Sequence, residues 1–237
     1  MNRTPADGRR WAAQGTDLVR RALRSLAPDD ATLAEPSALQ GWSRKHLVAH
    51  VAANAEALRN LATWARTGVE TPMYTSPEQR NADIEAGAQR SAADLVAWLD
   101  ASAAALASDW DAFDDATWSA EVRTARGRTL PASETPWLRA REVMVHAVDL
   151  GGDVTFADLP ADFLGALVDD IVAKRGGSGP ALHVAPTDAD QRWELAGDGD
   201  PVTVRGPLAQ IAAYLAGRDH AGLTTDGGGV PELGPWL

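Results

Sequence analysis

The segment WLRAREVMVHAVDL, residues 137–150, decides how the rest of the chain is interpreted. Thr135 is a candidate N-cap and Pro136 suits the first turn, where its missing N–H costs nothing, so the segment is predicted to be a helix. Glu142 and His146 are four residues apart, and their side chains therefore lie on one face of that helix. A carboxylate and an imidazole placed this way can bind one metal ion if a third ligand comes from elsewhere.

Composition excludes several classes of function. The chain has 237 residues with 33 acidic and 22 basic side chains, and its net charge of −11 argues against nucleic acid and anionic membranes as partners. It contains no cysteine, which excludes disulfides, thiolate metal sites and a cysteine nucleophile. We find no signal-peptide pattern and no apolar run of membrane-spanning length, so the sequence predicts a cytoplasmic protein without a membrane segment.

Hydrophobic periodicity and turn residues predict two domains. Long helices are expected over residues 6–26, 43–67, 77–107 and 135–150. Between the last two, residues 109–134 fit either a short hairpin or an irregular excursion. Beyond residue 152 the pattern changes to short strands between helices. Helices are predicted over 161–174 and 207–217, and strands over 181–185, 191–195 and 201–205. We therefore predict an α+β chain, with a four-helix bundle in residues 1–152 and a small α+β domain in residues 153–237.

Histidine is the best source of the third ligand. His46 and His50 both belong to the predicted helix over residues 43–67, and either can meet Glu142 and His146 across a bundle. His50 is favoured because it lies on the apolar stripe of its helix, whereas His46 lies near the start, on a more polar shoulder. Two alternatives stay open on spacing alone, namely hydrogen-bonded core histidines and a surface ion pair of Glu142 with Arg139 or Arg141.

Several motifs together resemble the mycothiol-dependent maleylpyruvate isomerases, which belong to the DinB-like metal-binding superfamily. The first is Gly41-Trp42-Ser43 leading into His50, and the most specific is Arg-Glu-x-x-x-His-Ala-x-Asp-Leu over residues 141–150. Tyr74-x₅-Arg80-x₃-Ile84-Glu85 also matches, and the resemblance spans nearly the whole chain. It implies a DinB-like four-helix bundle followed by a C-terminal domain of sterol-carrier-protein-like α/β character.

The resemblance also implies a site and a reaction. Its metal ligands correspond to His50, Glu142 and His146, which would hold Zn²⁺ or another divalent ion. The expected reaction converts maleylpyruvate to fumarylpyruvate, a step of aromatic-compound catabolism, through addition of a metal-bound thiolate, bond rotation and elimination. Since the chain has no cysteine, the thiol would be the cofactor mycothiol.

Two arginines match family positions that bind the carboxylates of the small anionic substrate. They are Arg80 in the third predicted helix and Arg218 after the last one, so the C-terminal domain would contribute to the active-site cleft. Without the resemblance, the preferred explanations are a solvated helix charge for Arg80 and a partner of the C-terminal helix dipole for Arg218.

Three rival functions remain on sequence grounds. They are a mycothiol S-transferase acting on electrophiles with the same metal site, a non-catalytic metal-binding module, and a metallohydrolase that uses metal-bound water. The hydrolase would need a general base, for which Asp149 is the nearest acid, although that residue can instead orient a ligand.

Overall fold

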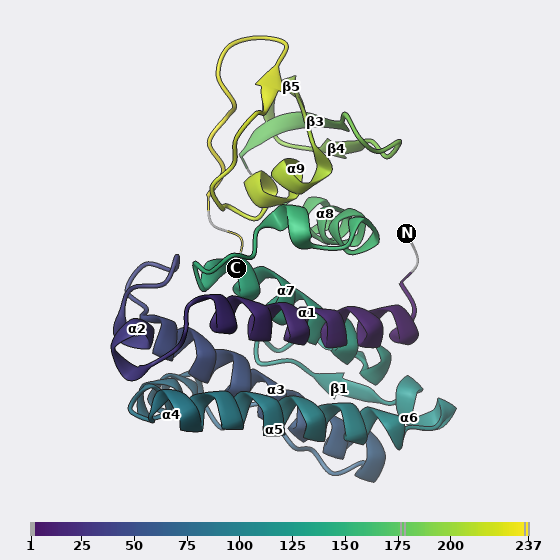
Figure 1. Cartoon of the computed structure of the whole chain (residues 1–237). Helices are drawn as coiled ribbons and strands as arrows, with labels where there is room; N and C mark the ends of the chain where they lie inside the picture. Colours follow the sequence, from purple (N-terminus) through teal and green to yellow (C-terminus); the bar gives the residue numbers. More distant parts are fainter. Residues whose placement is uncertain (1–2, 176, 178, 235, 237) are drawn as a thin grey trace. The chain divides into compact units, whose positions relative to one another are not determined.

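The computed structural model describes residues 3–175, 177, 179–234 and 236, in two compact units (Figure 1). The helical unit runs over Arg3–Val154, and the mixed unit follows from Thr155. This arrangement confirms the predicted α+β class, with a helical N-terminal part and a small C-terminal sheet. Among the described helices, none is long and apolar enough to cross a membrane.

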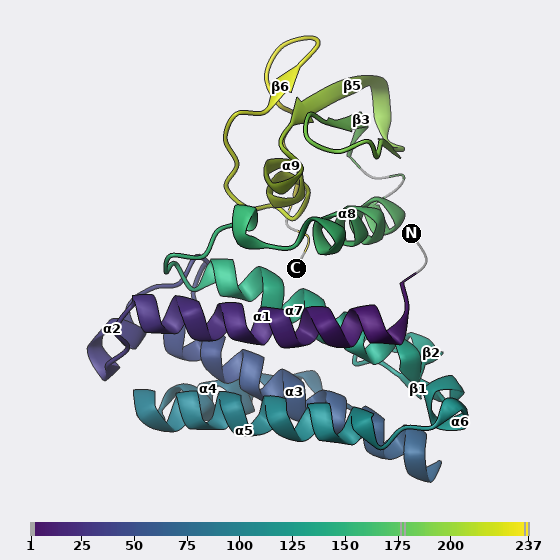
Figure 2. The ribbon, with the colours of Figure 1, turned by 45° about the vertical axis from the view of Figure 1, so that its right-hand side comes forward.

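The N-terminal unit is built on long helices that pack side by side. Helix α1 lies along α7, and α3 packs against both α4 and α5 (Figures 1 and 2). The elements of this unit are α1 (Pro5–Ser25), α2 (Asp30–Ala34), α3 (Arg44–Thr67), α4 (Pro77–Ala88), α5 (Ala92–Asp111), α6 (Asp115–Ser119), β1 (Glu121–Arg123), β2 (Thr129–Pro131), the 3₁₀ turn η1 (Ala132–Glu134) and α7 (Thr135–Asp149). Strands β1 and β2 pair antiparallel, so the hairpin alternative for residues 109–134 is correct.

Capping residues fix where the central helix begins and ends. The Ser43 hydroxyl accepts a hydrogen bond from the backbone N–H of His46, and the Ser43 backbone N–H donates to Nδ1 of the His46 ring, which forms a capping box at the start of α3. Gly68 ends the helix with φ of 70°, a left-handed conformation that glycine adopts without strain. These signals explain why the prediction over residues 43–67 is confirmed.

Two local predictions are wrong. The helix expected over residues 77–107 is broken, because Ser91 accepts a hydrogen bond from the Asp94 N–H and caps a new helix, α5. Thr135 is not an N-cap but the first residue of α7, since its hydroxyl donates to the Ala132 carbonyl and accepts from Trp110 Nε1.

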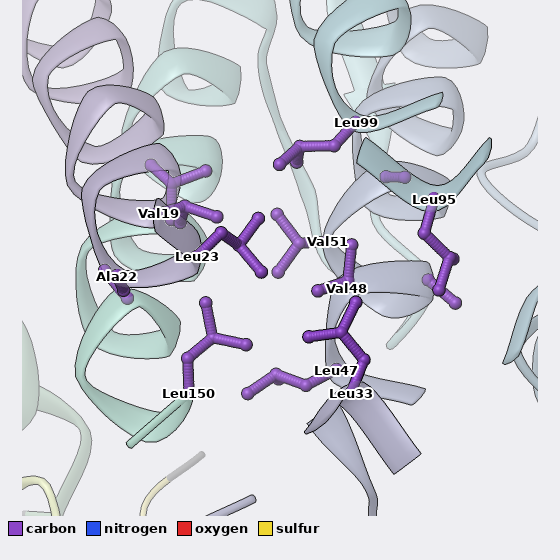
Figure 3. Packing of buried hydrophobic residues seen from close by; sticks show 14 of the residues in the cluster. Val19, Ala22, Leu23, Leu33, Leu47, Val48, Val51, Leu95, Leu99 and Leu150 are labelled. Carbon is purple, nitrogen blue, oxygen red and sulfur yellow. The ribbon is translucent and has the colours of Figure 1, made fainter. Parts of the chain in front are cut away.

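The core of the unit lies where the helices converge. In Figure 3, Val19 and Leu23 of α1 point toward Val51 of α3 and Leu99 of α5, while Leu150 approaches from the end of α7. All five side chains are at most 2% exposed. Burial of this kind contributes about 1.5–3 kcal/mol for each large aliphatic side chain, so this cluster holds α3 and α7 at a fixed spacing.

The C-terminal unit is a mixed sheet with helices on one side (Figure 2). Its elements are η2 (Phe156–Asp158), α8 (Ala161–Arg175), β3 (Pro180–Pro186), β4 (Trp193–Leu195), β5 (Asp198–Gly206), α9 (Leu208–Leu215) and β6 (Thr224–Thr225). The strand order is β4-β3-β5-β6, with β3 and β5 parallel and the outer pairings antiparallel. Strand β6 was not predicted, because two residues are too short to show an alternating pattern.

Candidate metal centre

Helices α3 and α7 bring together the three side chains expected to bind a metal. His50 Nε2 lies 2.9 Å from Glu142 Oε2, and His146 Nε2 lies 3.3 Å from the same oxygen. The spacing of Glu142 and His146 on α7 places both on the face that meets α3, while the apolar stripe of α3 directs His50 inward. Both histidines are buried, at 5–6% exposure.

The donor set fits a tetrahedral metal ion with an open position. The three ligand atoms lie within 4.8 Å of one another, and this is the cluster of possible metal ligands found among the described residues. Zinc bound at about 2.0–2.1 Å in a tetrahedron separates its ligands by about 3.3 Å, close to the distances seen here. Two histidines and one carboxylate leave one position for water or a substrate.

The residues around the cluster fix the orientation of its rings. Asp149, which is 1% exposed, places Oδ2 2.8 Å from His146 Nδ1, so Nε2 is the nitrogen turned toward Glu142. Trp42 packs edge-on against His50, with 5.3 Å between ring centroids. The Gly-Trp-Ser motif therefore supports one ligand, and Asp149 acts as the orienting acid that the sequence offered as one of its two roles.

Protonation follows from burial and from these contacts. Burial by itself would raise the pKa of Glu142, but hydrogen bonds with His146 and His50 hold it well below its usual range. Burial lowers the pKa of His50. For His146 burial acts in the same direction, yet the hydrogen bonds to Asp149 and Glu142 outweigh it and raise the pKa to about 9. In the absence of a metal, Glu142 is thus ionised and His146 carries the compensating proton.

The predicted arginines lie in different units. Arg80 of α4 places Nη2 3.4 Å from His50 Nδ1, and its guanidinium lies 5.9 Å from the centre of the Tyr74 ring. Arg218 belongs to the C-terminal unit, just beyond α9, where its Nη1 donates to the Ala216 carbonyl. His46, the weaker candidate, contacts Ser43 and Glu85 instead of the cluster.

The sequence does not predict that Arg139 is buried in the helical unit. The sequence predicts it only as a surface partner for Glu142, but it is 1% exposed and its Nη1 donates to the Val51 carbonyl and to Asn54 Oδ1. A signal was present, because Asn54 is a polar residue on the apolar stripe of α3 and Arg139 is one turn before Glu142.

Comparison with known proteins identifies the family of the chain. The family model for the mycothiol maleylpyruvate isomerase N-terminal domain matches residues 11–151, which is more than half of the chain. The chain belongs to the mycothiol maleylpyruvate isomerase family. The model for the C-terminal domain of the same family matches residues 158–235.

Solved structures extend the family assignment to the whole fold. A crystal structure of the mycothiol-dependent maleylpyruvate isomerase superposes with a TM-score of 0.91 at 44% identity, covering 98% of this chain and 97% of the other. A histidine-to-alanine mutant of such an isomerase superposes with the same TM-score and coverage at 43% identity. A comparison with curated proteins gave no match.

Proposed function

We propose that this chain converts maleylpyruvate to fumarylpyruvate in a mycothiol-dependent reaction, with a zinc ion held by His50, Glu142 and His146. The observation that carries the proposal is the meeting of these three ligand atoms in a chain 44% identical to a solved isomerase of that activity. Nitrogen and carboxylate donors in a three-ligand set suit zinc with an open position. The bound ion would keep the thiol of mycothiol ionised, and an ionised thiol can add reversibly to the double bond and permit its rotation.

The chain's own residues would bind and orient the substrate. Arg80, whose Nη2 lies 3.4 Å from His50, brings a planar cation next to the cluster, where it would pair with one substrate carboxylate. We assign the second carboxylate to Arg218, so that residues 1–152 supply the metal ligands and residues 153–237 contribute to the active-site cleft. These contacts would orient the double bond for thiolate addition, and the bond can rotate only after that addition has made it single.

The assay is the conversion of maleylpyruvate by protein of measured metal content, with and without mycothiol, followed by NMR of the cis and trans products. We expect turnover that needs substoichiometric mycothiol and leaves its concentration unchanged. Consumption of mycothiol into a stable thioether would instead identify an S-transferase.

Glu142→Gln with Glu121→Gln as its control tests the site. Glu142 is a proposed ligand, whereas Glu121 is an exposed residue of β1, so only the first change should abolish turnover. Equal activity of the two variants would contradict the site, and absence of turnover by metal-loaded wild-type protein with mycothiol would contradict the reaction.

A further inference from the structure

Tyr74 is an aromatic residue near the metal cluster to which the proposed reaction assigns no role. It belongs to the segment of residues 69–76, which connects α3 to α4, and its side chain is partly buried. The guanidinium of Arg80 lies 5.9 Å from the centre of the Tyr74 ring, within the range of a cation–π contact. Arg80 Nη2 in turn lies 3.4 Å from His50 Nδ1, so Arg80 stands between the ring and the cluster.

The connecting segment is tied to α3 by the side chain of Asn60. Its Nδ2 donates to two consecutive carbonyls, that of Pro72 at 3.2 Å and that of Met73 at 3.3 Å. One amide thus serves the two residues that come directly before Tyr74. Asparagine suits this place because its NH₂ group carries two donors, whereas the ionised carboxylate of aspartate carries none. Asn60 therefore fixes the backbone from which the Tyr74 ring projects.

Arg80 needs support of this kind because α4 offers its side chain other partners. Asp83 is an exposed acid three residues further along α4, which is the spacing of an ion pair on a helix surface. Tyr74, Asn60 and Asp83 all line a groove of about 370 Å³, so loss of the ring would enlarge open space beside that acid. A long side chain that is ordered only when a ligand arrives costs binding free energy at that moment.

We propose that Tyr74 is a positioning residue for Arg80, and that Asn60 holds Tyr74 in place for this role. The ring keeps the guanidinium next to His50 before the substrate arrives, so a carboxylate meets a cation that is already oriented. Burial raises the pKa of Tyr74, and the neutral phenol leaves the charge of Arg80 for that carboxylate. The proposal rests on the proposed function in one respect, namely that Arg80 binds a carboxylate of the substrate.

Maleate is the probe, because it is a cis dicarboxylate and no thiol addition can occur when mycothiol is left out. Isothermal titration of the zinc-loaded chain should give saturable binding that Arg80→Gln weakens about 10- to 100-fold, the usual range for a charged hydrogen bond. Tyr74→Leu should weaken it about fivefold, since it removes the cation–π contact that orients Arg80. Binding that Arg80→Gln leaves unchanged, or no saturable binding by the wild type, would overturn the proposal.

A double-mutant cycle shows whether Tyr74 acts through Arg80. Once Arg80→Gln has removed the cation, adding Tyr74→Leu should weaken maleate binding less than about twofold further. If the two effects add instead, Tyr74 contributes independently of Arg80 and the positioning role is refuted.

Two single variants serve as controls for Tyr74→Leu. Tyr74→Phe keeps the ring, so it should bind maleate within about twofold of the wild type. Equal loss in Tyr74→Phe and Tyr74→Leu would refute the role of the ring. Val69→Leu introduces the same leucine into the same segment, at a residue that is 66% exposed, and should leave binding unchanged. A loss in Val69→Leu as large as that in Tyr74→Leu would assign the effect to the segment and contradict a specific role for Tyr74.

Asn60→Asp tests the tether, because aspartate has nearly the same shape but donates no hydrogen bond. It should weaken maleate binding about two- to fivefold in the wild-type background and have no further effect once Arg80→Gln is present. Unchanged binding would show that the segment is held without Asn60. A loss that persists in the Arg80→Gln background would come from the added negative charge, and either result would refute the tether.

Turnover separates this proposal from the proposed function. In the isomerase assay Tyr74→Leu should raise KM for maleylpyruvate more than it lowers kcat, with zinc content unchanged. If the wild type shows the expected coupling in maleate binding but does not convert maleylpyruvate, the reaction is wrong and the positioning role stands. If it converts maleylpyruvate while the effects of Tyr74→Leu and Arg80→Gln add, the positioning role is wrong and the reaction stands.

Discussion

Asp149→Asn should change metal uptake in a way that depends on pH. Asp149 Oδ2 lies 2.8 Å from His146 Nδ1 and is almost completely buried. This contact and the one with Glu142 raise the pKa of His146 to about 9, against the effect of burial. At neutral pH an incoming metal must therefore displace a proton from His146 before Nε2 can bind it.

The size of the effect follows from that pKa. In the wild type, apparent zinc affinity should rise about tenfold per pH unit up to about pH 9, which makes the proton penalty at pH 7 about 100-fold. Asparagine carries no negative charge and stabilises the imidazolium less than aspartate does, so the pKa of His146 falls and the penalty shrinks. The same carboxylate makes His146 a better ligand, and losing such a partner costs about 10- to 100-fold in metal affinity. The variant should therefore bind zinc much more weakly above pH 9 and differ little from the wild type at pH 7.

Competition with a chromophoric chelator between about pH 6.5 and pH 9.5 measures the zinc affinity of the wild type and of Asp149→Asn. This range runs from the ordinary pKa of histidine, about 6.5, to just above the raised pKa of His146, about 9. Titration calorimetry in buffers of different ionisation enthalpy counts the proton released. Asp153→Asn is the matched control, because Asp153 pairs with Arg21 on the surface and should leave the profile unchanged. Parallel profiles for wild type and Asp149→Asn at every pH would refute the role given to Asp149.

Three further outcomes are expected. His50→Ala should lose the metal, whereas His46→Ala, four residues earlier on α3, should retain it. Metal content after dialysis measures both, and equal retention by the two variants would contradict the ligand set. In urea unfolding, metal-free protein should be less stable at pH 9 than at pH 6.5, by roughly 3 kcal/mol. The raised pKa of His146 contributes stability that is fully present below the pKa of an unfolded histidine and is lost as pH rises through about 9. A free energy of unfolding that does not change with pH would be inconsistent with a protonated His146. Arg218→Ala should lower kcat/KM for the dicarboxylate about 10- to 100-fold with metal content unchanged, the usual range for one charged hydrogen bond, and unchanged kinetics would exclude a substrate contact.

Local signals predicted most of the N-terminal unit. Ser43 and Gly68 bound α3 as expected, because caps depend on neighbouring residues alone. The break between α4 and α5 was missed for a physical reason. Ile84 and Leu95 lie on either side of it and are both buried, so the apolar pattern continues across a change of helix direction.

The candidate site was predictable to the extent that it depends on helix faces. Spacing paired Glu142 with His146, and the apolar stripe of α3 favoured His50 over His46. Asn54, a polar residue on the apolar stripe of α3, indicates a buried polar partner, but spacing does not identify Arg139 as that partner, because Val51 and Asn54 lie far away in sequence on another helix. Local rules describe which side chains share a face, but they do not determine which faces meet.

We propose that His50, Glu142 and His146 hold a zinc ion whose open position takes the thiolate of mycothiol. X-ray absorption at the zinc edge tests it directly, on loaded protein before and after addition of mycothiol. Because the chain has no cysteine, a sulfur neighbour at about 2.3 Å should be absent before addition and present after it. A zinc shell of nitrogen and oxygen that stays unchanged with mycothiol would show that the thiolate does not bind the metal.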